Sequence, residues 1–471
     1  MGESWKKRRL LLTINVALAS FFLAACQPPD LSQLKENTLH IVNKSKVFGD
    51  DKSDPGENTK RSAAKSLNQI LDGSLTSGNS GSDFASVLKA ALQDDPVIIS
   101  KRQNVASKAA SIGSTEAQKD FQVSSTFYGG VEDITDNTKG LAVALSASRL
   151  VFDGGMIDAQ IEAKKYQEKA ARLELRAVID ERAARLGRIW IELEKYETLR
   201  DQIDSRLAVL DPLIDQLEQV ANAGIGDVSK VTAAQRTVAT IRVTETNIAE
   251  GLEKARLDFE NAFGDLRGDI RYDPEFISKL VPNEISDELV QKVPSLLTQY
   301  ASYQSSLARI TSLKAKDDFN IGFEAKAMRP FAGSGYDSDE SVGLVARKTI
   351  FNGGMLESEI VEAEAAAEAS LAQIQATYRD GVRIIESARQ NIESMDKAIA
   401  LARENASLTA DEIVYLRQQL IIGGSTLDSV LSAEARLYEA ESQEINFIAD
   451  KRQSQLVIVS ALGLLGPALG F

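Results

Sequence analysis

The chain is poor in the residues that most enzyme and metal sites need. Its 471 residues include one cysteine, Cys26, and one histidine, His40. A single copy of each excludes a zinc site built from cysteine and histidine, and it excludes a disulfide framework. His40 lies in a polar stretch, which argues against a triad that relies on a positioned histidine. We therefore expect no metal, no cofactor and no catalytic residue, although enzymes that use only carboxylates or lysine stay open.

Acidic residues outnumber basic ones, and aromatic residues are scarce. The chain has 54 Lys and Arg against 68 Asp and Glu, and its formal net charge is −14. Neutralising phosphates requires clustered cations, so we expect no nucleic-acid partner. Aromatic residues make up 6% of the chain, which is low for a compact enzyme core and usual for long coiled helices.

The N-terminus has the pattern of a bacterial export signal. Basic residues at 6–9 precede an apolar run over 10–25, which is too short to be a good membrane span. The run ends at Cys26 in a lipobox-like sequence, which predicts a lipoprotein signal peptide over 1–25 and lipidation of Cys26. An ordinary signal peptide with a chance cysteine is the alternative. Gln27, where inner-membrane lipoproteins commonly have Asp, favours the outer membrane. The polar residues 26–84 are predicted to form an extended tether.

The rest of the chain is a tandem duplication. Four landmark residues recur 198 or 199 positions later: Pro96 as Pro294, Phe152 as Phe351, Gly224 as Gly423 and Gly264 as Gly463. The spacing predicts one repeat over 85–266, a linker over 267–283 and a second repeat over 284–467.

Each repeat follows the same plan. Alternation of apolar and polar residues predicts strands at 121–131, 140–152, 319–327 and 341–351. Gly129, Gly130, Asp136 and Asn137 are expected to supply turn residues for the first pair, and Gly333, Ser334 and Gly335 for the second. Helical segments are predicted before the strands, near 87–118 and 287–316. A very long helix and a return helix are predicted after them, at 156–222 with 228–263 and at 355–421 with 426–462.

The first long helix carries a heptad pattern, which is typical of a coiled coil. Only Arg200 interrupts it, and Pro212 is a possible kink. The apolar positions are Leu186, Ile189, Leu193, Tyr196, Ile203, Leu207, Leu210, Ile214 and Leu217. A helix of this length spans roughly 100 Å if unbroken.

Four strands cannot close a membrane barrel alone, because open edges in lipid leave backbone groups unpaired. Three chains would supply twelve strands. The predicted fold is therefore mainly helical with a small β part: two long helical hairpins and two β-hairpins per chain, arranged as a trimeric twelve-stranded β-barrel continuous with an α-helical barrel.

The duplicated order of these motifs resembles the TolC family of outer-membrane factors over about 85–467. The resemblance rests on the Phe-Asp/Asn-Gly-Gly-Met segments at 152–156 and 351–355 and on the glycine-rich helix tips at 224–228 and 423–427. It implies a homotrimer in outer-membrane lipid with its helices in the periplasm. It also implies a passive duct for efflux or type I secretion, driven by an inner-membrane transporter and joined to it by a periplasmic adaptor.

The resemblance assigns roles to three sets of residues. The adaptor would dock at the tips marked by Gly224, Gly226, Gly423 and Gly424. The passage from strand to helix would use Gly154, Gly155, Gly353 and Gly354. Candidate aperture carboxylates, for which a solvated outer face is the alternative reading, are Asp211, Asp215, Asp411 and Glu412.

Two other functions compete with the duct. A structural coiled-coil envelope lipoprotein would explain the lipobox and heptads, but it would not explain the duplicated strand pairs. A periplasmic adaptor would carry one helical hairpin, whereas this chain has two. Efflux and type I secretion cannot be separated from the sequence.

Overall fold

The computed structural model describes residues 83–133, 138–223, 228–264, 271–333 and 336–471, which all belong to one unit of the chain, residues 64–471. The predicted signal peptide, Cys26, Gly224 and Gly226 lie outside the described residues.

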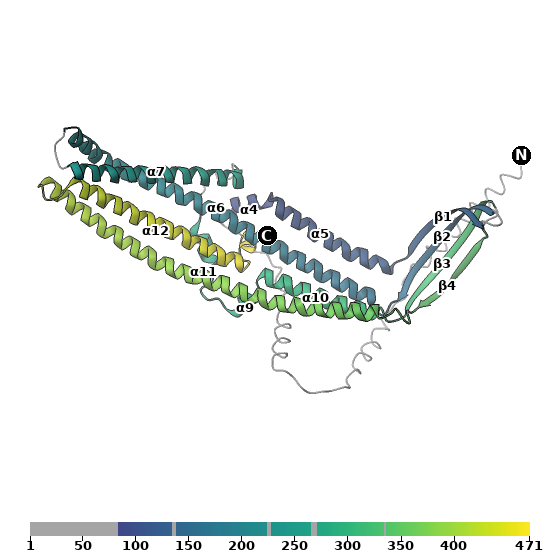
Figure 1. Ribbon diagram of the computed structural model, residues 1–471. Helices are drawn as coiled ribbons and strands as arrows, with labels where there is room; N and C mark the ends of the chain where they lie inside the picture. The colour runs from purple at the N-terminus through teal and green to yellow at the C-terminus, as the bar shows by residue number, and fades with distance from the viewer. Residues whose placement is uncertain (1–82, 134–137, 224–227, 265–270, 334–335) are drawn as a thin grey trace, which may run out of the picture. The chain divides into compact units, whose positions relative to one another are not determined.

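The elements follow one plan twice (Figure 1). In each copy, helices precede two strands, and a 67-residue helix and a helix of 36 or 35 residues follow them. The first copy consists of α4 (Asp83–Gln93), α5 (Pro96–Glu116), the 3₁₀ turn η2 (Ala117–Lys119), β1 (Gln122–Asp133), β2 (Thr138–Phe152), α6 (Met156–Asn222) and α7 (Val228–Phe263). The second consists of α9 (Asp287–Gln291), α10 (Pro294–Ala315), β3 (Asn320–Gly333), β4 (Asp339–Arg347), α11 (Met355–Ile421) and α12 (Leu427–Ala461), with α8 (Pro274–Leu280) before it and α13 (Leu465–Ala468) after it.

Each predicted helical segment before the strands, near 87–118 and 287–316, is divided into two helices. The divisions fall before Pro96 and Pro294, which occupy the first positions of α5 and α10. Proline lacks a backbone N–H and fits the first turn of a helix, where that donor has no intrahelical partner. Asp95 caps α5 by accepting hydrogen bonds from the backbone N–H groups of Val97 and Ile98.

The four strands form one antiparallel sheet in the order β1-β2-β3-β4. The prediction that Gly129 and Gly130 form a turn is wrong, because both pair within β1, with Leu141 and Gly140. A Cβ on Gly129 would lie 2.9 Å from the Leu141 Cδ2 atom, so the glycine leaves room for that cross-strand side chain. β3 runs beyond its predicted end, and its Pro330 sits beside a register shift, where a missing N–H is tolerated.

The two long helices have the bounds that the sequence predicted, and α6 continues through Pro212. Most of the predicted apolar positions on α6 are buried or partly buried in clusters with neighbouring helices. Where Arg200 interrupts the heptad, the adjacent Leu199 is buried instead. The helix therefore keeps an apolar face by shifting it by one residue.

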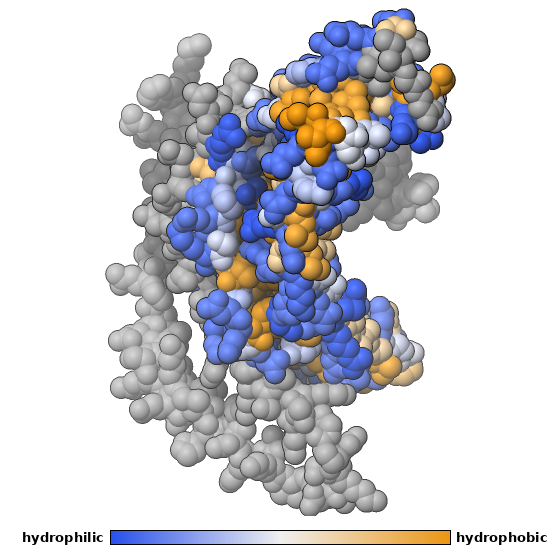
Figure 2. All heavy atoms as spheres, turned by 90° about the vertical axis from the view of Figure 1, so that its left-hand side faces the viewer, coloured by the Kyte–Doolittle hydropathy of each residue, from blue (hydrophilic) through white to orange (hydrophobic). Residues whose placement is uncertain are grey.

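The largest core surrounds Trp190 of α6, whose side chain is fully buried. The rings of Phe84, Phe259 and Phe263 lie 4.9–5.2 Å from it, with edge-to-face geometry. Phe84 also packs on Tyr272, at 5.1 Å. This cluster fastens α4 and the segment before α8 to the first helical hairpin. A view from the hairpin-tip side shows a mostly hydrophilic surface with hydrophobic patches between (Figure 2).

Candidate functional site

The passage from strand to helix is made by glycine pairs with left-handed backbone. Gly154 and Gly155 have φ values of 67° and 86°, and Gly353 and Gly354 have values of 71° and 80°. L side chains rarely adopt this region, so glycine suits these four positions. In the first copy, Asp153 accepts hydrogen bonds from the backbone N–H groups of two following residues, Gly155 at 3.0 Å and Ile157 at 2.7 Å.

The tip of the second helical hairpin is a glycine turn with an apolar edge. Gly423 has a φ of 78°, and the Gly424 N–H donates to the Gln419 carbonyl at 2.8 Å, which ends α11. Ile421 and Ile422 are 86% and 80% exposed beside this turn. Their exposure on a charged helix is a feature that the sequence analysis missed, although two isoleucines directly before a glycine pair could have indicated it.

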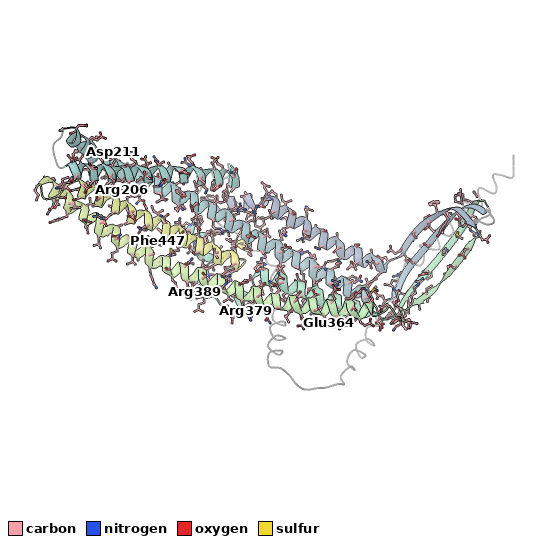
Figure 3. The ribbon with its side chains drawn as sticks, viewed as in Figure 1. Arg206, Asp211, Glu364, Arg379, Arg389 and Phe447 are labelled. Atoms are coloured by element: carbon pink, nitrogen blue, oxygen red, sulfur yellow. The ribbon has the colours of Figure 1, made fainter. Side chains whose placement is uncertain are left out.

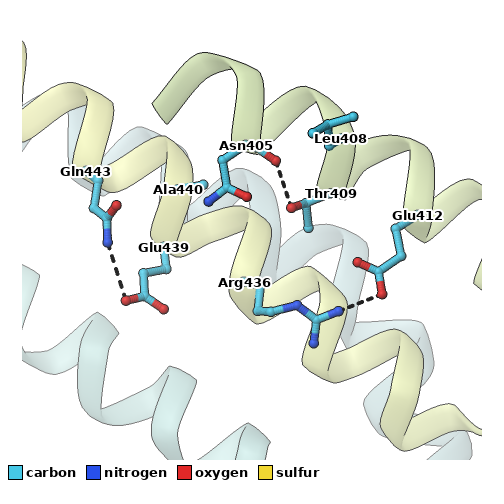
Figure 4. Close-up of a pocket in the computed structure, with 8 residues that line it drawn as sticks. All are labelled: Asn405, Leu408, Thr409, Glu412, Arg436, Glu439, Ala440 and Gln443. Atoms are coloured by element: carbon cyan, nitrogen blue, oxygen red, sulfur yellow. Dashed lines mark hydrogen bonds and ion pairs between the residues drawn. The ribbon is translucent and has the colours of Figure 1, made fainter. Parts of the chain in front are cut away.

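The four candidate aperture carboxylates lie on α6 and α11 and are all exposed. Two of them are engaged by arginines of the return helices. Asp211 lies 3.8 Å from Arg242 of α7, and Glu412 accepts a hydrogen bond from Arg436 of α12 at 2.8 Å (Figures 3 and 4). Asp215 and Asp411 make no ion pair with the residues described. No contact among the described residues brings the four together.

Beside Glu412, a groove of about 410 Å³ lies between α11 and α12 (Figure 4). Its lining is largely polar: Asn405, Leu408, Thr409, Glu412, Arg436, Glu439, Ala440 and Gln443. Within the described ranges, no three His, Cys, Asp or Glu side chains are grouped so that they could hold a metal ion.

A charge network centred on one buried glutamate joins the two helical hairpins near the tips, and the sequence analysis did not find it. Glu434 of α12 is 1% exposed. It contacts Arg206 of α6 at 3.3 Å and Arg417 of α11 at 2.6 Å. Arg206, labelled in Figure 3, also contacts Glu441 at 2.6 Å. The signal in the sequence is a single glutamate within the apolar face of α12, beside Val430, Leu431, Ala433 and Leu437.

The sheet has one apolar and one polar face, because side chains alternate along each strand. The apolar face exposes large side chains, including Val123, Phe127, Val342 and Leu344 at 67–76%. On the polar face, Glu324 pairs with Arg347, and Ser124 and Ser146 share a hydrogen bond of 2.8 Å. None of the helices in the described part of the chain combines the length and apolar character needed to cross a membrane.

Comparison with known proteins relates this architecture to outer-membrane channels. The sequence pattern of a family described as outer membrane efflux protein matches residues 285–464. Outer membrane protein TolC of Escherichia coli (strain K12) is 25% identical over 283 residues, which are 54% of this chain and 55% of that protein. Its counterpart in Salmonella enteritidis is 25% identical over 280 residues, with the same coverage. The chain thus spans about half the length of the curated relatives it matches.

Solved structures share the fold over most of the chain. That of CusC matches with a TM-score of 0.68 at 14% identity, covering 80% of this chain and 92% of CusC. VceC of Vibrio cholerae matches with a TM-score of 0.68 at 16% identity, covering 80% and 95%. The open-state MtrE outer membrane channel of Neisseria gonorrhoeae matches with a TM-score of 0.66 at 15% identity, covering 82% and 91%. These structures have the same mainly helical architecture with a small antiparallel sheet.

These proteins are described as outer membrane proteins or outer-membrane channels. The chain is thus similar to the outer membrane efflux protein family over its second repeat, to TolC over about half of its length, and to solved outer-membrane channels in its fold.

Proposed function

We propose that this chain is the outer-membrane component of a tripartite efflux or type I secretion system. Three copies would form a passive duct, and an inner-membrane transporter would supply the energy through a periplasmic adaptor. The observation that carries the proposal is the open four-stranded sheet, which has one apolar face and is followed by helices too polar to cross a membrane.

The open edges of the sheet support the proposed assembly of three copies. β1 and β4 are its edges, and each is hydrogen-bonded to only one of the described strands. Unpaired strand edges are costly in lipid, so a sheet that enters a bilayer must close. Joining β1 of one copy to β4 of the next would give twelve strands, with the apolar face toward lipid and the polar face toward water.

The helices supply the length of the duct. α6 and α11 each have 67 residues and extend roughly 100 Å. They would project into the periplasm, and their tips would lie nearest the inner membrane. The adaptor would dock at Gly423, Gly424 and the exposed Ile421 and Ile422, and at Gly224 and Gly226 of the first hairpin, with the lipid on Cys26 adding an anchor in the outer membrane.

Of the four candidate aperture carboxylates, Asp215 and Asp411 suit the role better than the other two. Asp211 and Glu412 are partly neutralised by arginines of the return helices. Threefold symmetry would place three copies of Asp215 and of Asp411 around the axis and would favour cations.

The mass of the detergent-extracted full-length complex tests the assembly. We expect three copies, stable in mild detergent and resistant to dilution. A species with one copy under conditions that keep the helices folded would overturn the proposal. It would favour the structural envelope lipoprotein, which does not explain the exposed apolar sheet face.

A further inference from the structure

At the helical end of the sheet, each β-hairpin holds a cation over a phenyl ring. The guanidinium of Arg149 lies 5.2 Å from the centre of the Phe121 ring, and the Lys348 ammonium lies 5.4 Å from that of Phe319. The two pairs correspond in the duplication, since Phe319 comes 198 residues after Phe121 and Lys348 comes 199 after Arg149. The same arrangement thus occurs in both copies of the repeat.

Both pairs belong to the apolar face of the sheet. The Phe121 ring contacts the Phe323 ring at 6.2 Å, and Phe323 is the cross-strand partner of Arg149. Phe319 lies four residues before Phe323, and Lys348 lies four residues after the exposed Leu344, so alternation puts them on that face too. Both cations are exposed, and the two rings are 46% and 54% exposed.

The charges at this border differ from those elsewhere on the sheet. On the polar face, Arg347 pairs with Glu324, and Lys326 lies 3.6 Å from Asp339. At the loop end of the apolar face, Arg329 pairs with Glu340. Arg149 and Lys348, by contrast, make no ion pair with any described residue. Three sheet cations with described side chains, Lys326, Arg329 and Arg347, are thus paired within the chain, whereas Arg149 and Lys348 are left for an external anion.

The nearby carboxylates do not supply that anion. Asp318, next to Phe319, packs instead against the strand-to-helix turn, where a Cβ on Gly154 would lie 2.6 Å from the Asp318 Cβ. Asp120 and Asp317 are exposed, and neither pairs with Arg149 or Lys348 in the part of the chain that is described.

The position of the pairs fits one border of an apolar band. Val143 on β2 is the partner of Arg329, so six residues separate the two charged borders along that strand. Six residues of strand span about 20 Å. The apolar band of an outer-membrane barrel is roughly 25 Å tall, so the border near the helices would lie at the headgroups of the leaflet that faces the periplasm.

We infer that the Phe121–Arg149 and Phe319–Lys348 pairs form a binding site for the phosphate groups of anionic glycerophospholipids in that leaflet. The cations would hold the phosphate, and the rings, which have no polar tip, would lie at the start of the acyl region. The inference rests on the proposed insertion of the sheet into the outer membrane.

Lipid retention by the full-length detergent-extracted chain tests the site. The protein is mixed with equal amounts of phosphatidylglycerol and phosphatidylcholine, and bound lipids are counted by native mass spectrometry, which also reports the copy number. We expect the wild type to retain phosphatidylglycerol preferentially. Arg149→Gln with Lys348→Gln should lower that preference about fivefold for each cation removed.

Two variants serve as controls. Arg309→Gln with Arg379→Gln removes the same charge from exposed positions on α10 and α11 and should keep the wild-type preference. Arg149→Lys with Lys348→Arg keeps both charges and should therefore also keep the wild-type preference for phosphatidylglycerol.

Three results separate the possible explanations. A wild-type lipid preference in the double glutamine variant overturns the site, while a copy number of three leaves the proposed channel standing. Complete competition by soluble glycerol phosphate also overturns it, because the site would then bind the anion without the bilayer. The proposed site is supported if only the double glutamine variant loses the preference for phosphatidylglycerol and its copy number is unchanged.

Discussion

Glu434 and Arg417 join the two helices of the second hairpin close to its tip. The Arg417 Nη2 atom lies 2.6 Å from the Glu434 Oε1 atom, and the other carboxylate oxygen lies 3.3 Å from Arg206 of the first hairpin. One buried carboxylate is therefore shared by α6, α11 and α12. Because the Glu434 carboxylate is shielded from solvent, Arg206 and Arg417 balance its negative charge in place of water.

Replacing Glu434 with Gln should loosen the tip region. The change leaves Arg417 without its carboxylate partner and weakens the link to Arg206, while Glu441 still holds Arg206. Hydrogen bonds to charged groups contribute about 1.5–3 kcal/mol. Hydrogen exchange of the backbone amides in α11 and α12 near the tip should accelerate roughly tenfold or more. Glu439→Gln, an exposed glutamate on the same helix, should leave exchange unchanged, and equal acceleration in both variants would contradict the prediction.

Two glycines within helices should respond to alanine in opposite directions. A Cβ on Gly251 of α7 would lie 2.1 Å from a ring atom of Tyr196 on α6, so the close approach of these helices requires glycine there. Gly251→Ala should destabilise the first hairpin by about 1–3 kcal/mol. On α11, a Cβ on Gly381 would meet nothing within 4 Å, and Gly381→Ala should stabilise by about 0.5–1 kcal/mol. Melting followed by helical circular dichroism measures both, and shifts of the same sign would refute the packing argument.

Asp180 should make a contribution to folding stability that is lost as pH rises from about 4 to 7. Burial raises the pKa of Asp180 to about 7, although the Gly466 N–H donates to it at 2.9 Å and the charge of Arg176 acts in the opposite direction. Between these pH values the carboxyl is protonated in the folded protein but ionised in the unfolded chain. Each unit of pH therefore favours unfolding by up to about 1.4 kcal/mol.

Asp180→Asn should remove this dependence, because an amide does not titrate and its oxygen can still accept from Gly466. The difference in melting temperature between the variant and the wild type should grow from pH 4.5 to pH 7.5, in favour of the variant. Asp201→Asn, at an exposed position on the same helix, controls for the loss of a charge. A difference that stays constant with pH would show that Asp180 is ionised in both states.

The candidate carboxylates should differ in their effect on ion selectivity. Asp215→Asn and Asp411→Asn should each lower the preference for cations, measured as the reversal potential across a salt gradient, because each removes three charges from the proposed aperture. Asp211→Asn and Glu412→Gln should change it less, since arginines already offset those charges. If Asp211→Asn and Glu412→Gln lowered the cation preference more than Asp215→Asn and Asp411→Asn did, the assignment of Asp215 and Asp411 to the aperture would be wrong.

The sequence predicted the regular parts of this architecture well. The bounds of α6 and α11 follow from an apolar pattern between glycine pairs, and such patterns are local. The errors arose where local signals have two meanings. Gly129 and Gly130 indicate a turn in isolation, but in β1 they accommodate the neighbouring strand. Pro96 and Pro294 mark the repeat in the sequence, and in the structure they are also the first residues of new helices.

The site features that were missed depend on contacts between distant segments. Glu434 and Arg206 are 228 residues apart, and Asp180 and Gly466 are 286 apart. Periodicity shows that a helix has a buried face, but it does not show which helix covers that face. The proposed neighbours of Asp215 and Asp411 are the same residues in other copies of the chain. The pattern within one chain therefore does not show these contacts.

Single-channel recording tests the central claim most directly. The detergent-extracted complex is inserted into a planar bilayer, and its conductance and reversal potential are measured at several salt concentrations. The account predicts discrete openings that prefer cations, with a preference that weakens as added salt screens the carboxylates. Verified three-copy complexes that insert but carry no current, even after Asp215 and Asp411 are neutralised, would contradict it.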